Sequence, residues 1–267
     1  MEYMGLIISF IVNILIAIGV PIGILIYFSI KKRELVKPFL IGALVFLVSQ
    51  VLLRIPLLNG VLSKMDWFYN MMVLNPLLYA VFLGLTAGIF EEVGRFVGFE
   101  VGLKKNRSWY DGLAFGLGHG GIEAIIFAGI SSIQNLYVLF TLNNGTFNEA
   151  LVGASEETVR WTFSSTSSMM VLYGGIERIS AVIMHIGFTM LVLYGVNKGK
   201  KTLYLLWAIL AHGVVDTTVV VAQQAGASIH VVELICAVFA VILLVSIIRF
   251  KGSFENFKEV KENEKVY

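Results

Sequence analysis

Residues 73–103 read VLNPLLYAVFLGLTAGIFEEVGRFVGFEVGL, an apolar run that is long enough to cross a lipid bilayer as a single helix. Near the middle of this run stand Glu91, Glu92 and Arg95, three ionisable residues at a depth where hydrocarbon should surround the chain. Ionisable side chains are costly inside a bilayer, and membrane proteins that keep them there generally use them. The stretch therefore predicts a membrane-spanning helix that carries part of a functional site.

The composition indicates that the whole chain is a membrane protein. Of its 267 residues, 57% are hydrophobic and 14% are charged, whereas soluble domains contain about 25% charged residues. The net charge of +2 is too small to indicate a nucleic-acid partner. Seven runs reach the length of about 20 residues that a membrane-spanning helix needs, and they are 5–29, 38–58, 73–103, 109–140, 169–196, 202–222 and 229–249.

These runs predict an all-α membrane protein with about seven transmembrane helices in the lipid bilayer. One polytopic domain is expected over residues 1–250, and a short cytoplasmic tail over 251–267. The first run is too long for a removable signal peptide, and it lacks the small-residue cleavage site.

The Lys and Arg residues predict the orientation of the chain in the cell membrane. All but five of the 20 lie in the C-terminal segment that starts at Arg249 and in three connections, which are 31–37, 104–107 and 198–201. Positively charged connections stay in the cytoplasm. The N-terminus is therefore expected outside and the C-terminus in the cytoplasm.

Four of the seven spans carry an ionisable residue at the same depth. These residues are Glu91, His119, His185 and His212. Each lies 11 to 13 residues along its span from the Lys and Arg cluster at the cytoplasmic end. At about 1.5 Å per residue, this distance is roughly 17–20 Å, near the middle of a hydrocarbon core of about 30 Å. We expect the four to share one site.

Helical spacing places further ionisable residues beside these four. Arg95 follows Glu91 by four positions and Glu92 by three, so both carboxylates can reach its guanidinium group. The other neighbours lie one or two turns away, and they are Glu123 beside His119, Arg178 near His185 and Asp216 beside His212. Together with Glu177, the acids of this layer outnumber its arginines by three. Protonation or a bound metal cation must therefore balance the charge.

Arg54 is expected to stand apart from this layer. It lies near the outer end of the second span. Long basic side chains in such positions extend toward the membrane surface, so we predict no part in the site for Arg54.

The chemistry that this layer suits is hydrolysis. The adjacent acids Glu91 and Glu92 can take a proton from water and return it to a leaving amine. His119 and His212 can donate hydrogen bonds to a developing oxyanion. Alternatively, His119, His185 and His212 can ligate a divalent metal such as zinc, which would polarise the same carbonyl group. The residue pattern leaves both alternatives open.

Glycines in the third and fourth spans are spaced for close helix packing. The small residues recur every fourth position, at Gly84/Gly88, Gly94/Gly98/Gly102 and Gly116/Gly120. This spacing lets helix backbones approach each other and side chains bond across the contact. We expect the helices that carry Glu91 and His119 to approach their neighbours closely.

Three motifs occur in a fixed order along the chain, Glu91-Glu92-x-x-Arg95, Phe115-x-x-x-His119 and His212-x-x-x-Asp216. They resemble the glutamate-dependent intramembrane proteases, a superfamily with the type II CAAX prenyl endopeptidases, their bacterial CPBP relatives and the PrsW proteases. The resemblance covers a four-helix catalytic core at about residues 76–222. The runs HGGIE (119–123), Glu-Arg (177–178) and HIGF (185–188) are most similar to the bacterial YhfC family of intramembrane peptidases.

The resemblance implies roles for these residues. Glu91 would be the base that activates water, with Glu92 beside it, and His119 and His212 would be the catalytic histidines. Five residues would orient these groups and balance their charge, and they are Arg95, Glu123, Arg178, His185 and Asp216. The substrate would be a membrane protein or peptide, cut at a bond in or next to the membrane.

Two other functions remain open. A proton-coupled transporter of small solutes also uses buried Glu, His and Asp residues as proton relays. However, the chain lacks the inverted repeat and the Pro-broken helix pair that are typical of such transporters. A catalytically inactive scaffold of the same fold is the second alternative, because the superfamily has a non-catalytic branch.

Overall fold

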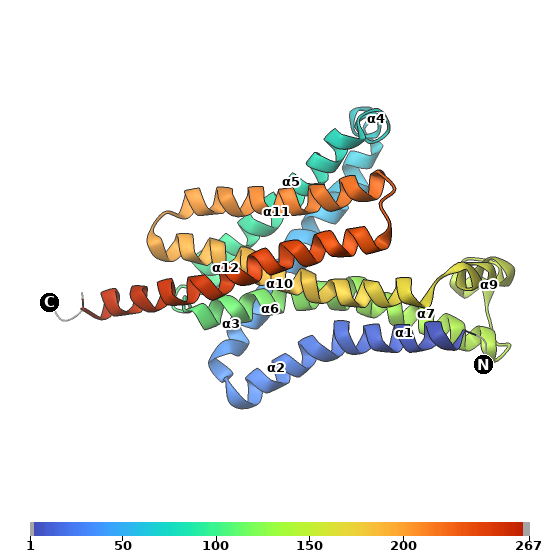
Figure 1. Ribbon diagram of the computed structural model, residues 1–267, viewed down its shortest axis with the longest axis horizontal. Helices are drawn as coiled ribbons and strands as arrows, with labels where there is room; N and C mark the ends of the chain where they lie inside the picture. The colour runs from blue at the N-terminus through green and yellow to red at the C-terminus, as the bar shows by residue number, and fades with distance from the viewer. Residues whose placement is uncertain (1–2, 264–267) are drawn as a thin grey trace.

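The structure is a computed structural model that describes residues 3–263, with side chains described as far as Phe254. All secondary structure in these residues is helical. Seven helical spans are long and apolar enough to cross a membrane, and they are Met4–Lys31, Arg33–Lys64, Pro76–Gly102, Trp109–Asn143, Ser168–Lys198, Lys201–Gln224 and Ile229–Phe254 (Figure 1). The prediction of an all-α protein with seven transmembrane helices is therefore confirmed. Residues 264–267 of the expected tail lie outside the described residues.

The helices follow one another along the chain in a simple order. The first span consists of α1 (Met4–Ile14) and α2 (Val20–Lys31), and the second of α3 (Val36–Phe46) with π-helical turns at Leu47–Arg54 and Leu57–Val61. The third to seventh spans contain α5 (Pro76–Val97), α6 (Trp109–Ala124) with α7 (Ile130–Asn143), α10 (Ser168–Lys198), α11 (Lys201–Gln224) and α12 (Ile229–Asn263). The short helices α4 (Asp66–Leu74), α8 (Glu149–Val152) and α9 (Glu156–Ser165) lie in the connections.

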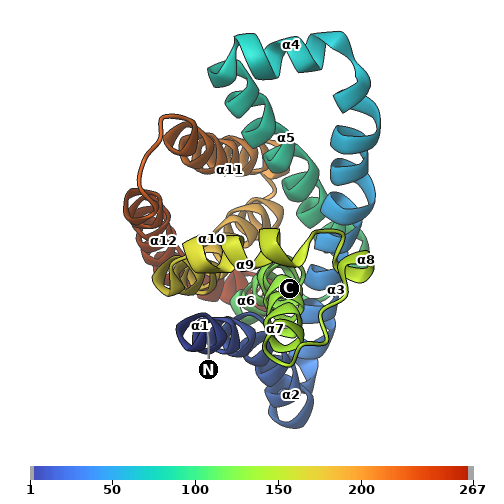
Figure 2. The same ribbon diagram turned by 90° about the vertical axis from the view of Figure 1, so that its right-hand side faces the viewer.

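Helix α10 lies at the centre of the bundle. In the most apolar part of α10, 67% of the residues are buried, against 22–33% in the other spans. It packs against α1, α6, α11 and α12, and the end-on view shows these helices around it (Figure 2). Side chains at the middle of α10 therefore face protein, and not lipid, on several sides.

Helix α6 begins at a capping box. The Ser108 hydroxyl accepts a hydrogen bond from the backbone N–H of Asp111 (3.2 Å), and the Asp111 carboxylate accepts one from the backbone N–H of Ser108 (2.9 Å). The box satisfies N–H groups that the first turn of a helix leaves without partners. It thereby determines where α6 starts, three turns before His119.

Glycines allow α5 and α6 to approach their neighbours at the polar layer. A Cβ atom on Gly88 would lie 2.6 Å from the carbonyl oxygen of Ile209 in α11. A Cβ atom on Gly116 would lie 2.6 Å from the Cα atom of Ile186 in α10. Both distances are too short for carbon, so glycine is required at each crossing. The close packing that the glycine spacing predicts is confirmed for these two pairs of helices.

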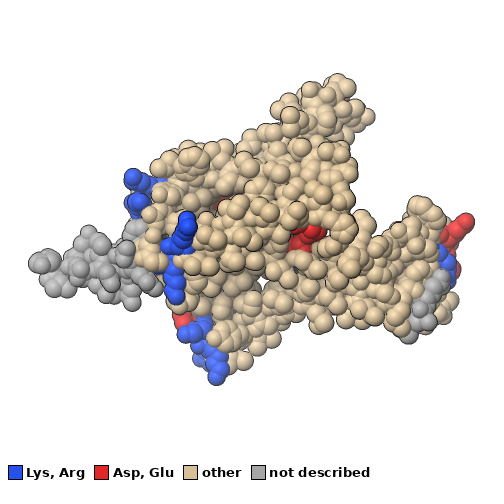
Figure 3. All heavy atoms as spheres, viewed as in Figure 1, with Lys and Arg blue, Asp and Glu red and all other residues tan. Residues whose placement is uncertain are grey.

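The charged residues gather at the ends of the molecule. Figure 3 shows Lys and Arg at the end where α12 finishes, and few charged side chains over the middle of this face. In the middle of this face, acidic side chains are visible in a recess.

Candidate active site

The predicted site residues form one connected network between four helices. α5 carries Glu91, Glu92 and Arg95, α6 carries His119 and Glu123, α10 carries Arg178 and His185, and α11 carries His212 and Asp216. Each of the nine contacts at least one other member through a hydrogen bond or an ion pair. The structure therefore brings together every residue that the sequence places in the layer.

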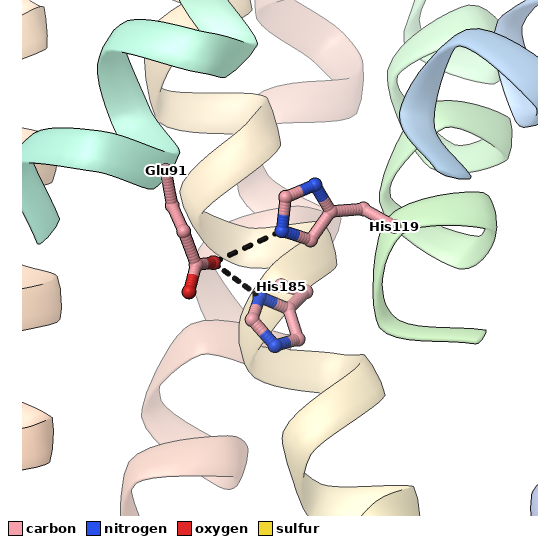
Figure 4. Close-up of side chains that lie close together, drawn as sticks. All are labelled: Glu91, His119 and His185. Carbon is pink, nitrogen blue, oxygen red and sulfur yellow. Dashed lines mark hydrogen bonds and ion pairs between the residues drawn. The ribbon is translucent and has the colours of Figure 1, made fainter. Parts of the chain in front are cut away.

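Glu91 is at the centre of this network. Its Oε2 atom lies 2.9 Å from Nε2 of His119 and 3.6 Å from Nδ1 of His185 (Figure 4). The same atom lies 3.2 Å from Nη2 of Arg95. Its Oε1 atom accepts a hydrogen bond from the side-chain amide of Gln50. The residue is only 4% exposed, so protein groups from three other helices define the position of its carboxylate.

Glu92 has different surroundings from its neighbour. Its Oε1 atom lies 2.6 Å from Nδ1 of His212 and is paired with Arg95, and the residue is fully buried. Its Oε2 atom has no hydrogen-bond partner in the described part of the chain. The two adjacent carboxylates therefore share Arg95 but contact different histidines, and Glu92 holds the histidine of α11.

Each partner of His185 indicates which ring nitrogen carries the proton. Nε2 of His185 is paired with the Glu123 carboxylate, and Nδ1 lies 2.6 Å from Nη2 of Arg95. A carboxylate accepts hydrogen bonds, and a guanidinium group only donates them. We therefore assign the proton to Nε2 and the lone pair to Nδ1, which faces Glu91.

The same reasoning applies to His212. Its Nδ1 donates to Glu92, which leaves the lone pair on Nε2 when the ring is neutral. Nε2 lies 3.6 Å from Oδ2 of Asp216 and 4.0 Å from Oε1 of Glu91. The reactive edge of this ring thus faces both Glu91 and Asp216.

Arg178 is connected to Glu91 through two other residues, Glu123 and His185. It donates to Oε1 of Glu123 (2.9 Å) and is also paired with Glu177. Glu123 in turn contacts His185. Arg178 therefore holds the carboxylate that orients a histidine.

A cavity of about 290 Å³ opens beside Glu91. Its polar lining comes from Arg54, Glu91, Glu123, Glu177, Arg178, His185, His212 and Asp216, and its apolar lining includes Phe188 and Val215. Glu92, Arg95 and His119 are fully buried and do not belong to this lining. A water molecule or a peptide group in the cavity would lie beside Glu91 and His212.

Two residues of the site were not predicted from the sequence. Gln50 donates to Glu91, and Arg54 donates to Gln50 Oε1 (3.2 Å) and to the backbone carbonyl of Leu83 (2.8 Å). The expectation that Arg54 reaches the membrane surface is wrong. The surplus of carboxylates and three acceptors at hydrogen-bond distance hold its guanidinium inside. The signal was the polar pair at positions 50 and 54, which share one helical face in the run 38–58, whose one other polar residue is Ser49.

Three of the residues fit a divalent metal. One donor atom each from Glu91, His119 and His185 lie within 4.8 Å of one another, and all three residues are buried. Two histidines and one glutamate form the donor set of many catalytic zinc sites, which keep a further position open. Glu123 also orients His185 from behind, as carboxylates do for zinc-bound histidines.

His212 differs from His119 and His185 in its suitability as a metal ligand. It is absent from the group of potential metal donors found among the described residues. Its Nδ1 is used by Glu92, and its Nε2 is 4.0 Å from the nearer Glu91 oxygen. The structure thus separates two histidines that suit a metal from one that pairs with Glu92 instead.

Comparisons with known proteins identify the family of the chain. The family described as YhfC intramembrane metalloprotease matches residues 14–236. The chain is 38% identical over 246 residues to a protein of Bacillus subtilis (strain 168) described as "Uncharacterized membrane protein YhfC", covering 90% of this chain and 94% of that protein. No solved structure matches the chain. The chain belongs to the YhfC intramembrane metalloprotease family.

Proposed function

We propose that the protein is an intramembrane peptidase, which hydrolyses a peptide bond of a substrate in or next to the bilayer. The observation that carries the proposal is the buried Glu91 carboxylate, which lines a cavity at mid-membrane depth between partners that define its position. A carboxylate in such a site can activate water, because fixed donors orient it and little bulk solvent competes.

The proposed reaction begins with water in the cavity. Glu91 takes one proton from the water as its oxygen attacks the carbonyl carbon of the substrate. The tetrahedral intermediate carries a negative oxygen, and His212 in its protonated form donates to that oxygen from Nε2. Glu92 stabilises this protonated ring through Nδ1. Glu91 then gives its proton to the leaving amine, and the products are a carboxylic acid and an amine.

The remaining members of the network hold these groups in place. His119 and Arg95 contact the Oε2 atom of Glu91 and are buried, so they orient it without meeting the substrate. Glu123 and Arg178 orient His185, and Asp216 lies beside the reactive edge of His212.

A divalent metal such as zinc suits this site as a cofactor. Glu91, His119 and His185 would hold it through Oε2, Nε2 and Nδ1. When bound, such an ion lowers the pKa of water and polarises carbonyl groups.

The proposed orientation places the N-terminus outside the cell membrane and the C-terminus in the cytoplasm. The gathering of Lys and Arg at one end of the molecule supports it (Figure 3). The wider relationship of this family to the CPBP, CAAX and PrsW proteases stays a prediction from the motifs.

The test is peptide hydrolysis by the purified full-length protein in lipid vesicles. Transmembrane peptides would be incubated with it, and new termini identified by mass spectrometry. Glu91→Gln should lower the rate by about 10²–10⁴-fold, the usual contribution of a general base. Glu100→Gln is the matched control, because Glu100 lies on the same span but pairs with Arg107 and Lys201. Equal hydrolysis by wild type and Glu91→Gln would refute the proposal.

A further inference from the structure

We propose that Gln50 and Arg54 are positioning residues, which act as a relay that fixes the carboxylate of Glu91 for catalysis. The inference rests on the proposed function. Both residues lie in the π-helical turn Leu47–Arg54 of the second span, outside the four-helix core. Neither belongs to a motif that the sequence singles out.

The first link of the relay is the contact between Gln50 and Glu91. Gln50 is 5% exposed, and its side-chain Nε2 donates to Oε1 of Glu91. The other oxygen of this carboxylate faces His119 and Arg95. Donors on both sides therefore hold the carboxylate plane, and Gln50 is the donor on the side of Oε1.

The second link determines which end of the Gln50 amide faces Glu91. A glutamine side chain can rotate by half a turn and exchange its donor NH₂ for its acceptor oxygen. Arg54 Nη1 lies 3.2 Å from Oε1 of Gln50, and a guanidinium group can only donate. Because Arg54 occupies the amide oxygen, the NH₂ group is left facing Glu91. Without Arg54, the amide could turn its oxygen toward the carboxylate and lose the hydrogen bond.

The third link anchors Arg54 to the helix that carries Glu91. Arg54 Nη2 donates to the backbone carbonyl of Leu83 (2.8 Å), and its Nε donates to the hydroxyl of Thr86 (3.3 Å). Leu83 and Thr86 lie in the two turns of α5 that precede Glu91. The relay therefore begins and ends on α5, and a rotation of the second span against that helix would change its hydrogen bonds.

The positions of the two residues relative to the cavity predict how kinetic constants change. Arg54 belongs to the described lining of the cavity, and Gln50 does not. Loss of Gln50 should therefore lower kcat and leave KM unchanged. Arg54 could also meet a substrate directly, so its action through Gln50 must be tested by combining the two changes.

The experiment is a double-mutant cycle on the full-length protein in lipid vesicles. Gln50→Met keeps the length of the side chain and removes the amide, and Arg54→Met removes the guanidinium. Gln50→Met should lower kcat by about 10–100-fold, as other changes beside a catalytic carboxylate or metal ligand do, with KM within about 2-fold of wild type. Arg54→Met should lower kcat in wild type and have no further effect in Gln50→Met. Arg54→Lys, which keeps a donor, should retain most of the activity.

The neighbouring residue Ser49 provides the control for this experiment. Ser49→Ala changes a buried residue of the same π-helical segment. Among the described contacts, the Ser49 hydroxyl donates a hydrogen bond only to the backbone carbonyl of Phe46, so this variant should leave kcat unchanged. Unchanged kcat in Gln50→Met, or effects of the two substitutions that multiply, would overturn the inference.

A second readout separates this inference from the proposed function. Thermal unfolding of the same four proteins needs neither turnover nor metal. If the relay exists, the two destabilisations are coupled, so the double variant loses less stability than the sum of the single variants. If wild type cleaves no peptide, the proposed function fails, and the unfolding cycle alone decides the relay. Additive changes in the unfolding temperature would then refute it.

Discussion

Nη2 of Arg95 lies 2.6 Å from Nδ1 of His185, although the two residues are 90 positions apart. An imidazole nitrogen has one lone pair in the ring plane, and it can accept one hydrogen bond or bind one metal ion. The guanidinium also lies 3.2 Å from Oε2 of Glu91. Arg95 therefore uses two of the three donor atoms that a metal would need.

This relationship predicts competition between Arg95 and the metal. Replacing Arg95 with Lys keeps a positive charge beside Glu92 but gives up the fork that reaches both Glu91 and His185. The Kd for zinc should fall by roughly 10-fold or more, since a hydrogen bond with a charged donor contributes about 1.5–3 kcal/mol. Competition with a chelating dye measures this change. An unchanged Kd would mean that metal and guanidinium do not share these atoms.

The zinc content of purified variants should distinguish the roles of the three histidines. Wild type should hold about one zinc ion per chain. His119→Asn and His185→Asn should lose this zinc, because both rings belong to the donor group. His212→Asn should keep the zinc and lose hydrolysis. His230→Asn is the control, because His230 is bonded to Tyr173 away from the network, and it should keep both. Zinc loss in His212→Asn would contradict this division.

Glu123 should control metal affinity through His185. In Glu123→Gln, the amide no longer requires the proton to stay on Nε2, so Nδ1 is no longer reserved for the metal. We expect zinc affinity to fall by about 10–100-fold, the usual range for such partners. Glu177→Gln is a matched change, since Glu177 also pairs with Arg178 and no ion pair joins it to His185 among the described contacts. Equal losses in both variants would show that only the local charge matters.

The glycine at the crossing of α6 and α10 should be essential for stability. A methyl group on Gly116 would meet the backbone of Ile186, which cannot turn away as a side chain can. Gly116→Ala should cost about 1–3 kcal/mol by overpacking and lower the thermal unfolding temperature. Gly23→Ala should be neutral or slightly stabilising, since no described atom lies within 4 Å of the added group and alanine favours helix. Equal unfolding temperatures for the two variants would contradict the close crossing.

The number of spans and the depth of the polar layer could be predicted from the sequence because both follow from counting. A span needs about 20 apolar residues, and each helical residue advances about 1.5 Å. The pairing of Arg95 with Glu91 and Glu92 is equally local, since residues three and four apart share a helical face. The structure has both ion pairs.

The partners of each histidine could not be predicted, because they depend on contacts between helices. His119, His185 and His212 have the same depth in the sequence, and spacing along one helix does not say which neighbour each ring faces. In the structure, His185 faces Glu123 and Arg95, and His212 faces Glu92.

Arg54 shows most clearly that contacts between helices could not be predicted from one span. By its position in an isolated span, a guanidinium near the end of the helix should extend to the surface. The chain by itself thus determined the seven spans and the buried layer of charge, because hydrophobicity and helical rise act on each segment alone. Only the tertiary structure decided that Arg54 turns inward to Gln50 and Leu83, since its acceptors come partly from another helix and exist only once the two have packed.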